Sequence, residues 1–215
     1  MQWPTLIVDD FFTDPHAVVK LSKTFKFTRA SDHAWPGTRS LPLHQVDKDF
    51  FLWSTQKIMA VLYPMERVTM QWEADQHFQR VPHGTHGKEG WVHADLPYEF
   101  TSIIYLSNHV QSGTCLYSGK HFNILPKYKE EKEKFYRDLK DKPRMNRYRN
   151  KNNSQFTKKV ELFSNFNRLV LFDGHQWHAS NHADADKGDR LTLITFFKNI
   201  RCKNMQYPLA AMRRI

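Results

Sequence analysis

From residue 68 onward, the chain is dominated by short strand-like segments, each bounded by residues that favour turns. Many short strands at close spacing favour an antiparallel sandwich or barrel over a helical bundle or a doubly wound sheet. The expected strands cover residues 68–72, 77–81, 91–95, 100–106, 114–117, 156–163, 168–172 and 190–197. The pattern therefore predicts a jelly-roll-like core.

Helical patterns are concentrated before this region. An edge strand is expected within residues 4–12, and Asp14 followed by Pro15 is typical of a helix N-terminus, because Asp accepts from free backbone amides and Pro has none to satisfy. A second helix is expected over residues 45–62. The predicted fold class is α+β, mainly β: a double-stranded β-helix (jelly-roll or cupin-like) core with N-terminal helices packed on one sheet.

A length of 215 residues suits a single domain over residues 1–215. We expect residues 1–66 to form a helical support and residues 67–200 the jelly-roll core, with a charged insertion at residues 125–155. The chain has no membrane-spanning apolar run and no leader-like start, which predicts a cytoplasmic protein. Its two cysteines, Cys115 and Cys202, lack metal-binding spacing, and we expect them to be buried small residues.

A candidate metal site begins with His93 and Asp95 at the end of an expected strand. Residues two apart on a strand point to the same face, so this imidazole and this carboxylate can bind one ion. The same triplet occurs at His182 and Asp184, but it lies in a polar loop with no histidine after it to complete a site. We therefore favour His93 and Asp95 as the first two ligands.

The third ligand is expected from a late strand. Residues 167–174 predict a strand and a turn; His175 falls at the turn, whereas His178 lies in the next extended segment. We therefore favour His178 over His175 as the partner of His93 and Asp95. Two imidazoles and one carboxylate leave three coordination positions open, which suits non-haem Fe(II). Zinc is the rival metal, although the chain has no HExxH motif.

A basic residue opens the last apolar strand. Arg190 and Thr192 are two residues apart and so share a face of that strand. Burial of a guanidinium is costly without an anion, and a guanidinium beside a hydroxyl suits a carboxylate. The alternative is that Arg190 begins the strand and points to solvent.

These motifs resemble those of the 2-oxoglutarate/Fe(II)-dependent dioxygenase superfamily, particularly its prolyl-hydroxylase-like branch. That family combines a His-x-Asp motif, a strand ending in Tyr-Leu-Asn, a Gly-Gly turn, and a late His followed by Arg-x-Ser. The matching segments are His93-Ala94-Asp95, Tyr105-Leu106-Ser107-Asn108, a turn with one glycine at Gly113, then His178 and Arg190-Leu191-Thr192. The resemblance covers residues 68–198, and the shared order of its elements makes it specific as a set.

The resemblance implies a hydroxylase that acts on a protein side chain of prolyl type or on a small metabolite, with release of succinate and carbon dioxide. Arg190 and Tyr105 would bind the distal carboxylate of the cosubstrate 2-oxoglutarate beside Thr192, and ascorbate is a candidate reductant for the Fe(II). Nucleic-acid demethylases of the AlkB type carry a second arginine where this chain has Phe196. We therefore rank nucleic-acid repair below a protein or small-molecule hydroxylase.

Positive charge is concentrated in one segment. The formal net charge is +10, and residues 127–151 hold eleven Lys or Arg against five Asp or Glu, so this segment supplies +6. Arg144, Arg147, Arg149 and Lys151 are interleaved with Tyr148, a pattern that could bind RNA or an acidic peptide. A solvated surface insertion is the commoner outcome of such a pattern, and it is the one we expect.

Two other functions stay open from the sequence. A jelly-roll module could bind nucleic acid through the basic insertion without catalysis, and a site of two histidines and a carboxylate could serve a zinc hydrolase. The segments 35–39 and 82–90 are candidate borders of a substrate entrance, although their composition fits plain surface loops better.

Overall fold

The computed structural model describes residues 4–29, 35–63, 70–82, 89–109, 111–119, 126–138, 141–181 and 188–202. Within these ranges the strands form two antiparallel sheets, ordered β1-β8-β5-β10-β4-β3-β2 and β7-β6-β9. The larger sheet contains β1 (Leu6–Val8), β2 (Phe27–Thr28), β3 (Thr38–Ser40), β4 (Met70–Val81), β5 (Phe100–Tyr105), β8 (Leu169–Asp173) and β10 (Arg190–Cys202). The smaller sheet contains β6 (Gly113–Gly119), β7 (Phe156–Phe163) and β9 (His178–Asn181).

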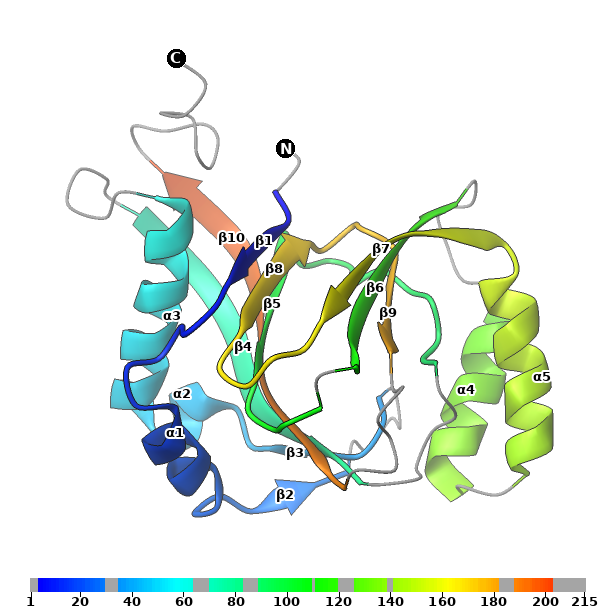
Figure 1. Cartoon of the computed structure of the whole chain (residues 1–215), viewed down its shortest axis with the longest axis horizontal. Helices are drawn as coiled ribbons and strands as arrows, with labels where there is room; N and C mark the ends of the chain where they lie inside the picture. The colour runs from blue at the N-terminus through cyan, green and yellow to red at the C-terminus, as the bar shows by residue number, and fades with distance from the viewer. Residues whose placement is uncertain are drawn as a thin grey trace.

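Helices lie on both sides of this pair of sheets (Figure 1). The N-terminal helices α1 (Pro15–Ser22), α2 (Leu43–Val46) and α3 (Lys48–Leu62) lie on the outer side of the larger sheet. The insertion helices α4 (Pro126–Asp138) and α5 (Lys142–Asn153) lie at the opposite end of the molecule, beyond the smaller sheet. The predicted fold class, a mainly β jelly roll with N-terminal helices packed on one sheet, is confirmed.

Alternation along the strands divides the core into two layers. Phe100 on β5 and Phe197 on β10 belong to the layer beneath α3, where their rings stack with centroids 4.3 Å apart. Ile103 and Ile194, of opposite parity on the same strands, belong to the cluster between the two sheets. Since successive side chains on a strand point to opposite faces, the strands of the larger sheet bury one face under helices and turn the other toward the smaller sheet.

The bounds of one strand and of one helix differ from the sequence-based expectation. Long-range strand pairing explains the first difference, and helix capping explains the second. The sequence predicts separate strands at 68–72 and 77–81, whereas β4 is one strand that pairs with β10 along its length, which holds the polar residues between them in the ladder. The sequence also predicts one helix over 45–62. Asp47 instead adopts an extended conformation between α2 and α3, and its carboxylate accepts from Phe50 N at 3.0 Å to cap α3.

Three further segments also differ from the sequence-based expectation. Residues 91–95 make only an isolated bridge between His93 and His178 instead of a full strand. The loop around residues 35–39 includes β3, which adds a short strand to β4. The charged insertion contains two helices, because Asp141 caps α5 by accepting from Arg144 N at 3.0 Å.

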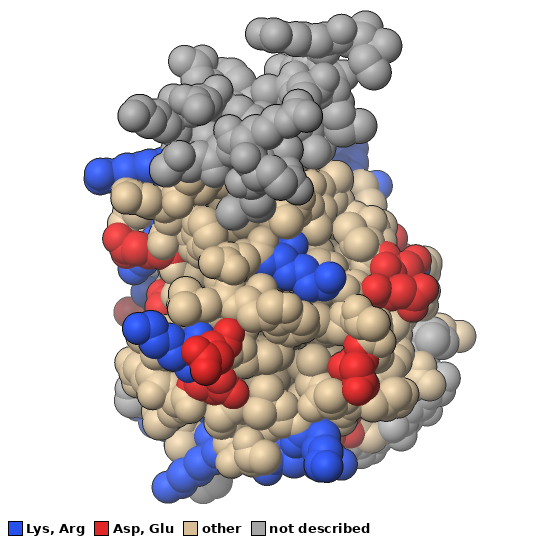
Figure 2. Space-filling model, turned by 90° about the vertical axis from the view of Figure 1, so that its left-hand side faces the viewer, with Lys and Arg blue, Asp and Glu red and all other residues tan. Residues whose placement is uncertain are grey.

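The face covered by α1 to α3 is mostly uncharged, with basic and acidic side chains in small separate groups (Figure 2). The formal net charge of +10 is therefore not gathered on this face. None of the helices in the described ranges combines the length and the apolar character that a membrane span requires.

Candidate metal and cosubstrate site

A cavity of about 820 Å³, counting its opening to solvent, lies between the two sheets and helix α4. Four alternate residues of β10 line it: Arg190, Thr192, Ile194 and Phe196. Leu191, Leu193 and Phe197, at the alternate positions of the strand, belong to the core beneath α3. One strand thus builds the core with one face and the cavity with the other, as the period of two requires.

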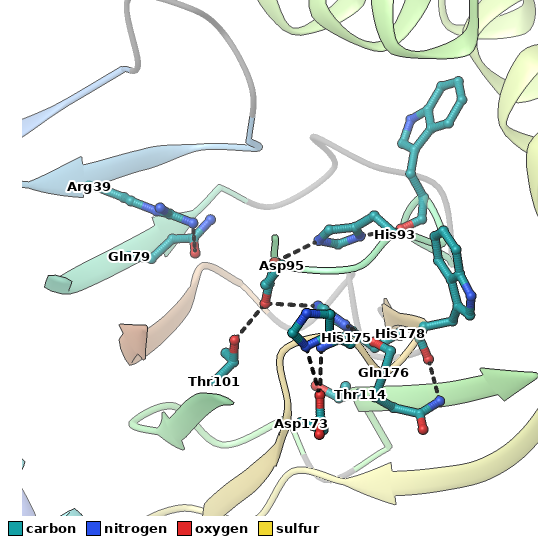
Figure 3. A network of polar contacts seen from close by, with 12 residues as sticks. Arg39, Gln79, His93, Asp95, Thr101, Thr114, Asp173, His175, Gln176 and His178 are labelled. Atoms are coloured by element: carbon teal, nitrogen blue, oxygen red, sulfur yellow. Dashed lines mark hydrogen bonds and ion pairs between the residues drawn. The ribbon is translucent and has the colours of Figure 1, made fainter. Parts of the chain in front are cut away.

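His93, Asp95 and His178 converge on this cavity (Figure 3). Their candidate ligand atoms all lie within 4.8 Å of one another. The two oxygens of Asp95 face different imidazoles: Oδ1 lies 3.5 Å from His93 Nε2, and Oδ2 lies 3.3 Å from His178 Nε2. The His93 side chain keeps 31% of its surface exposed, against 7% for His178, so the group is accessible from the His93 side.

Backbone carbonyls hold both imidazoles through Nδ1. His93 Nδ1 lies 2.8 Å from the carbonyl oxygen of Trp91, and His178 Nδ1 lies 2.9 Å from that of Gln176. A carbonyl can only accept, so in the neutral rings Nδ1 carries the proton and Nε2 keeps its lone pair. This is the arrangement that positions a histidine to bind a metal ion through Nε2.

Further hydrogen bonds hold the three residues in register. His93 N donates to His178 O at 2.9 Å, and His178 N donates to His93 O at 2.8 Å. Asp95 N donates to Gly174 O at 2.8 Å, and its side chain accepts from Thr101 Oγ1 at 2.7 Å. The geometry of the three side chains is therefore supported by their own backbone and by β5.

The electrostatics of the group favour a cation. Burial lowers the pKa of His93 to about 3, with a further contribution from the charge of His178. Burial also opposes the charged form of His178, but the carboxylate of Asp95 outweighs it and raises the pKa of His178. Burial opposes ionisation of Asp95 as well, yet its contacts with His178 and His93 bring the pKa of that carboxyl below its ordinary value. Asp95 is therefore ionised, and a divalent cation would replace the proton that it shares with His178.

Other candidate ligands do not join this group. The His175 side chain is 64% exposed, and its Nδ1 lies 3.3 Å from Asp173 Oδ1. His182 and Asp184 lie outside the described residues. Within the described part of the chain, the triad is the one cluster of three or more His, Cys, Asp or Glu that could hold a metal ion. Cys115 is buried, as expected, and the side chain of Cys202 lies outside what the structure describes.

Arg190 lines the cavity instead of pointing to bulk solvent. Its Cζ lies 5.3 Å from the centroid of the Tyr105 ring, and its Nε has no hydrogen-bond partner among the described residues. The Tyr105 hydroxyl lies 2.8 Å from Thr114 Oγ1, and Thr192 pairs with Tyr105 in the register of β10 and β5. Burial lowers the pKa of Arg190, so an anion beside the guanidinium would offset a real cost. The donors suit a carboxylate.

Sequence reasoning missed several polar residues of the cavity wall. Thr101 and Thr114 are hydroxyls in strands that are otherwise buried and largely apolar, and that contrast was an available signal. Lys132 and Tyr136 on α4 also line the cavity, and their spacing of four places them on one helical face. No local pattern indicates that this face meets the metal site.

The segment at residues 35–39, which we expected to be a plain loop, borders the cavity. Trp35, Pro36 and Arg39 all line it. Of the other candidate border, residues 82–90, Gly90 lines the cavity, and residues 83–88 lie outside the described ranges. The contact follows from the pairing of β3 with β4, which brings this segment over Gln79.

The insertion is docked on the site, contrary to the expectation of a solvated segment. Asn153 Oδ1 accepts from Val92 N at 2.9 Å, and Asn153 Nδ2 donates to Gly90 O at 2.9 Å. Asn152 Nδ2 donates to Val92 O at 3.1 Å. The Trp91 side chain packs into a cluster with residues of both insertion helices. Helix α5 therefore clamps the segment that carries His93.

The basic residues 144–151, which could have bound RNA, have different surroundings in the folded chain. Arg144 makes two hydrogen bonds of 3.0 Å with the carboxylate of Glu131, and Arg149 is buried. Only Arg147 and Lys151 of the run remain exposed without a described ion pair. Two of the four cations of the run are thus paired or buried, which weakens the case for a nucleic-acid interface.

Several solved structures resemble the chain. The non-haem α-ketoglutarate-dependent epimerase SnoN from nogalamycin biosynthesis has a TM-score of 0.56 at 9% identity, with 92% of this chain and 78% of SnoN covered. HygX from Streptomyces hygroscopicus, solved with nickel and 2-oxoglutarate bound, has a TM-score of 0.52 at 11% identity, with 91% and 82% covered. A Trichoplax adhaerens prolyl hydroxylase in complex with a hypoxia-inducible factor peptide has a TM-score of 0.49 at 12% identity, with 90% and 82% covered.

At such identities the likeness is one of fold. The chain has the jelly-roll fold of these 2-oxoglutarate-dependent enzymes, which confirms at the level of the fold the resemblance inferred from its motifs. Of the predicted site residues, His93, Asp95, His178, Arg190 and Thr192 line one cavity, whereas Tyr105 is not among its lining residues and lies behind it against Arg190 and Thr114.

In sequence, no curated protein matches the chain. A family profile matches residues 1–197, which include every strand and helix except the end of β10. That profile is described only as a family of unknown function. The chain therefore belongs to the family of unknown function DUF6445.

Proposed function

We propose that the chain is a non-haem Fe(II)- and 2-oxoglutarate-dependent oxygenase that acts as one domain over residues 1–215. The observation that carries the proposal is the convergence of both Nε2 atoms and the Asp95 carboxylate within 4.8 Å of one another in a cavity that Arg190 also lines. His93, Asp95 and His178 would hold Fe(II) on one face and leave the other face to ligands. The nickel and 2-oxoglutarate in the similar structure of HygX support this combination.

In this proposal the chain's residues position the cosubstrate and exclude water. The Arg190 guanidinium would bind the distal carboxylate of 2-oxoglutarate, with the Tyr105 hydroxyl as a second donor and Thr192 beside them. Ile194 and Phe196, on the same face of β10, would shield the reacting atoms from solvent. When bound, Fe(II) with 2-oxoglutarate and dioxygen would supply the oxidising power that removes a substrate hydrogen; one oxygen atom would leave in succinate, formed together with carbon dioxide, and the other would enter the product.

We infer that the reaction is a hydroxylation of a protein side chain of prolyl type or of a small metabolite. The exposed side of His93 opens on the cavity, where Trp35, Arg39 and Tyr136 form part of the remaining wall. A substrate C–H bond would approach the metal from this side.

Succinate release tests the proposal. The protein supplied with Fe(II), 2-oxoglutarate and ascorbate in the presence of dioxygen should form succinate, and Arg190→Met should abolish 2-oxoglutarate binding while metal binding is retained. Arg80→Met on the neighbouring strand is the matched control, because Arg80 lies over the Phe27 ring at 4.7 Å and does not line the cavity. Stoichiometric zinc without any affinity for 2-oxoglutarate would overturn the proposal and favour a zinc hydrolase.

A further inference from the structure

Two cations besides Arg190 line the cavity, and they come from different elements. Arg39 lies on β3 and Lys132 on α4, and both share the cavity wall with the metal triad. Asp95 is the only acidic residue among the described residues of that wall, and it already contacts both imidazoles and Thr101. The described residues of the wall therefore carry more positive than negative charge.

Aromatic rings and an amide hold Arg39 at the wall. Its Cζ lies 4.1 Å from the ring centroid of Trp35 and 5.3 Å from that of Phe196. Its Nη2 donates to Gln79 Oε1 at 3.4 Å. Figure 3 shows Arg39 and Gln79 on the side of the triad where β3 and β4 lie. Stacking of this kind fixes the plane of a guanidinium, whose N–H donors lie along its edge.

Lys132 differs from its neighbours on α4. Lys129 and Lys134 pair with Glu133 and Glu131 on the same helix, whereas Lys132 has no hydrogen bond or ion pair among the described residues. Burial lowers the pKa of Lys132 to about 8; Asp95 acts in the opposite direction, and the charge of Arg39 adds to the lowering. The ammonium is therefore mostly protonated at neutral pH in a place where its desolvation is costly.

The proposed cofactors bring no negative charge that would be left over to neutralise the Lys132 ammonium. The two positive charges of Fe(II) and the one of Arg190 would be balanced by Asp95 and by the two carboxylates of 2-oxoglutarate. Among the cations that line the cavity, Lys132 then remains without a described counter-charge, and the charge of Arg39 adds to the cost of its burial. A second anion, distinct from 2-oxoglutarate, would stabilise Lys132, and the Arg39 guanidinium would donate to the same anion.

We propose that the substrate oxidised at this site is a small molecule with a carboxylate or phosphate group, which Lys132 and Arg39 bind together. This inference rests on the proposed function. Trp35, which stacks on Arg39, and Tyr136, one turn after Lys132 on α4, also line the cavity and would contact the apolar part of the substrate. Because Lys132 comes from the insertion and Arg39 from β3, the insertion would contribute directly to substrate selection.

Ligand titrations without turnover test the inference. The full chain, loaded with Mn(II) and 2-oxoglutarate in the absence of oxygen, would be titrated by calorimetry with phenyl phosphate, phenylacetate and uncharged benzyl alcohol. The variants are Lys132→Met and Arg39→Gln, with Lys132→Arg as the charge-preserving variant. Lys129→Met, on the exposed side of the same helix, is the matched control. Thermal unfolding of each variant verifies that it is folded.

We expect at least one anion to bind and benzyl alcohol not to bind. Lys132→Met and Arg39→Gln should each weaken anion binding about tenfold to hundredfold, whereas Lys132→Arg and Lys129→Met should bind nearly as the wild type does. The tighter anion identifies the group as phosphate or carboxylate.

Three results would overturn the inference: no binding of either anion, unchanged binding in Lys132→Met and Arg39→Gln, or equal binding of the alcohol. An acidic peptide that binds through Lys132 when neither small anion does would also overturn it. The 2-oxoglutarate titration of the same samples separates the two proposals. Failure of 2-oxoglutarate to bind overturns the proposed function and this inference with it, whereas normal 2-oxoglutarate binding without anion binding overturns this inference alone.

Discussion

His178 and His175 lie three residues apart and have different surroundings. His175 sits in the turn after β8, where its backbone N donates to Asp173 Oδ1 at 2.8 Å. His178 begins β9 and is buried against the Phe172 ring, with centroids 4.6 Å apart. The extended backbone at His178 points its side chain inward, and the turn at His175 points its side chain outward. This difference allows a direct test of ligand identity.

Replacing His178 with Ala should weaken Mn(II) or Fe(II) binding by more than about a hundredfold, because loss of a ligand costs more than loss of a supporting hydrogen bond. Replacing His175 with Ala should leave metal affinity unchanged. Metal titration followed by electron paramagnetic resonance of Mn(II) measures both. Equal affinities for the two variants would contradict the assignment of His178.

Metal affinity should depend on pH in a defined direction. The pKa of His178 is raised by Asp95, so below that pKa a metal ion must displace a proton from His178. Affinity should therefore rise by about tenfold per pH unit on the acidic side of the raised pKa and level off above it. The pKa of His93 is about 3, so His93 adds no second step near neutrality. A pH-independent affinity between about pH 5 and 8 would contradict this picture.

At the scale of elements, α5 supports the metal site from outside the jelly roll. Asn153→Ala removes the bonds to Val92 N and Gly90 O and leaves a largely buried amide without its acceptor. We expect the free energy of unfolding to fall by about 2 kcal/mol and metal affinity to fall roughly tenfold. Chemical denaturation and metal titration measure the two effects.

Asn150→Ala is the control for this prediction. Asn150 is exposed on the same helix and none of its described side-chain contacts reaches the site. It should leave both quantities near the wild-type values. If Asn153→Ala behaved like Asn150→Ala, the insertion would not support His93.

The start of β8 depends on a second asparagine. Asn167 has a φ of 65°, and its side chain accepts from Phe12 N and donates to Phe12 O, each at 2.8 Å. Asn167→Ala should lower the free energy of unfolding by about 2–4 kcal/mol, because it removes both bonds and leaves a Cβ in the left-handed region without the side-chain hydrogen bonds that offset its cost. Asn167→Gly loses the bonds but tolerates the backbone, so it should be milder by about 1 kcal/mol. Equal losses in chemical denaturation would show that backbone conformation plays no part.

At the scale of the whole molecule, the site joins the two sheets. His178 belongs to the smaller sheet, and Arg190 belongs to the larger one. Metal and cosubstrate should therefore stabilise the folded chain as a unit. With each ligand at about one hundred times its Kd, each should raise Tm by about 5–10 °C.

Arg190→Met serves as the control for this effect. It should keep the increment from Mn(II) and lose the increment from 2-oxoglutarate in a thermal denaturation experiment. A full 2-oxoglutarate increment in this variant would mean that another cation, such as Lys132, binds the cosubstrate.

The extent to which the fold could be predicted follows from the range of the interactions. Alternation on β5 and β10 and the Asp14 cap of α1 are local, so their segments were predicted correctly. The union of two expected strands into β4 was missed, since it depends on pairing with a strand more than a hundred residues later. The same holds for residues 91–95, whose conformation is set by Gly174 and by α5 and not by their own propensity.

For the site, the sequence by itself determined the spacing of His93 and Asp95, the late position of His178, and the shared face of Arg190 and Thr192. These features need only the period of a strand and the order of the chain. Only the tertiary structure decided that Lys132 and Arg39 share that cavity, because their meeting depends on how α4 and β3 dock against it. Docking is set by packing between distant segments, and no local periodicity encodes it.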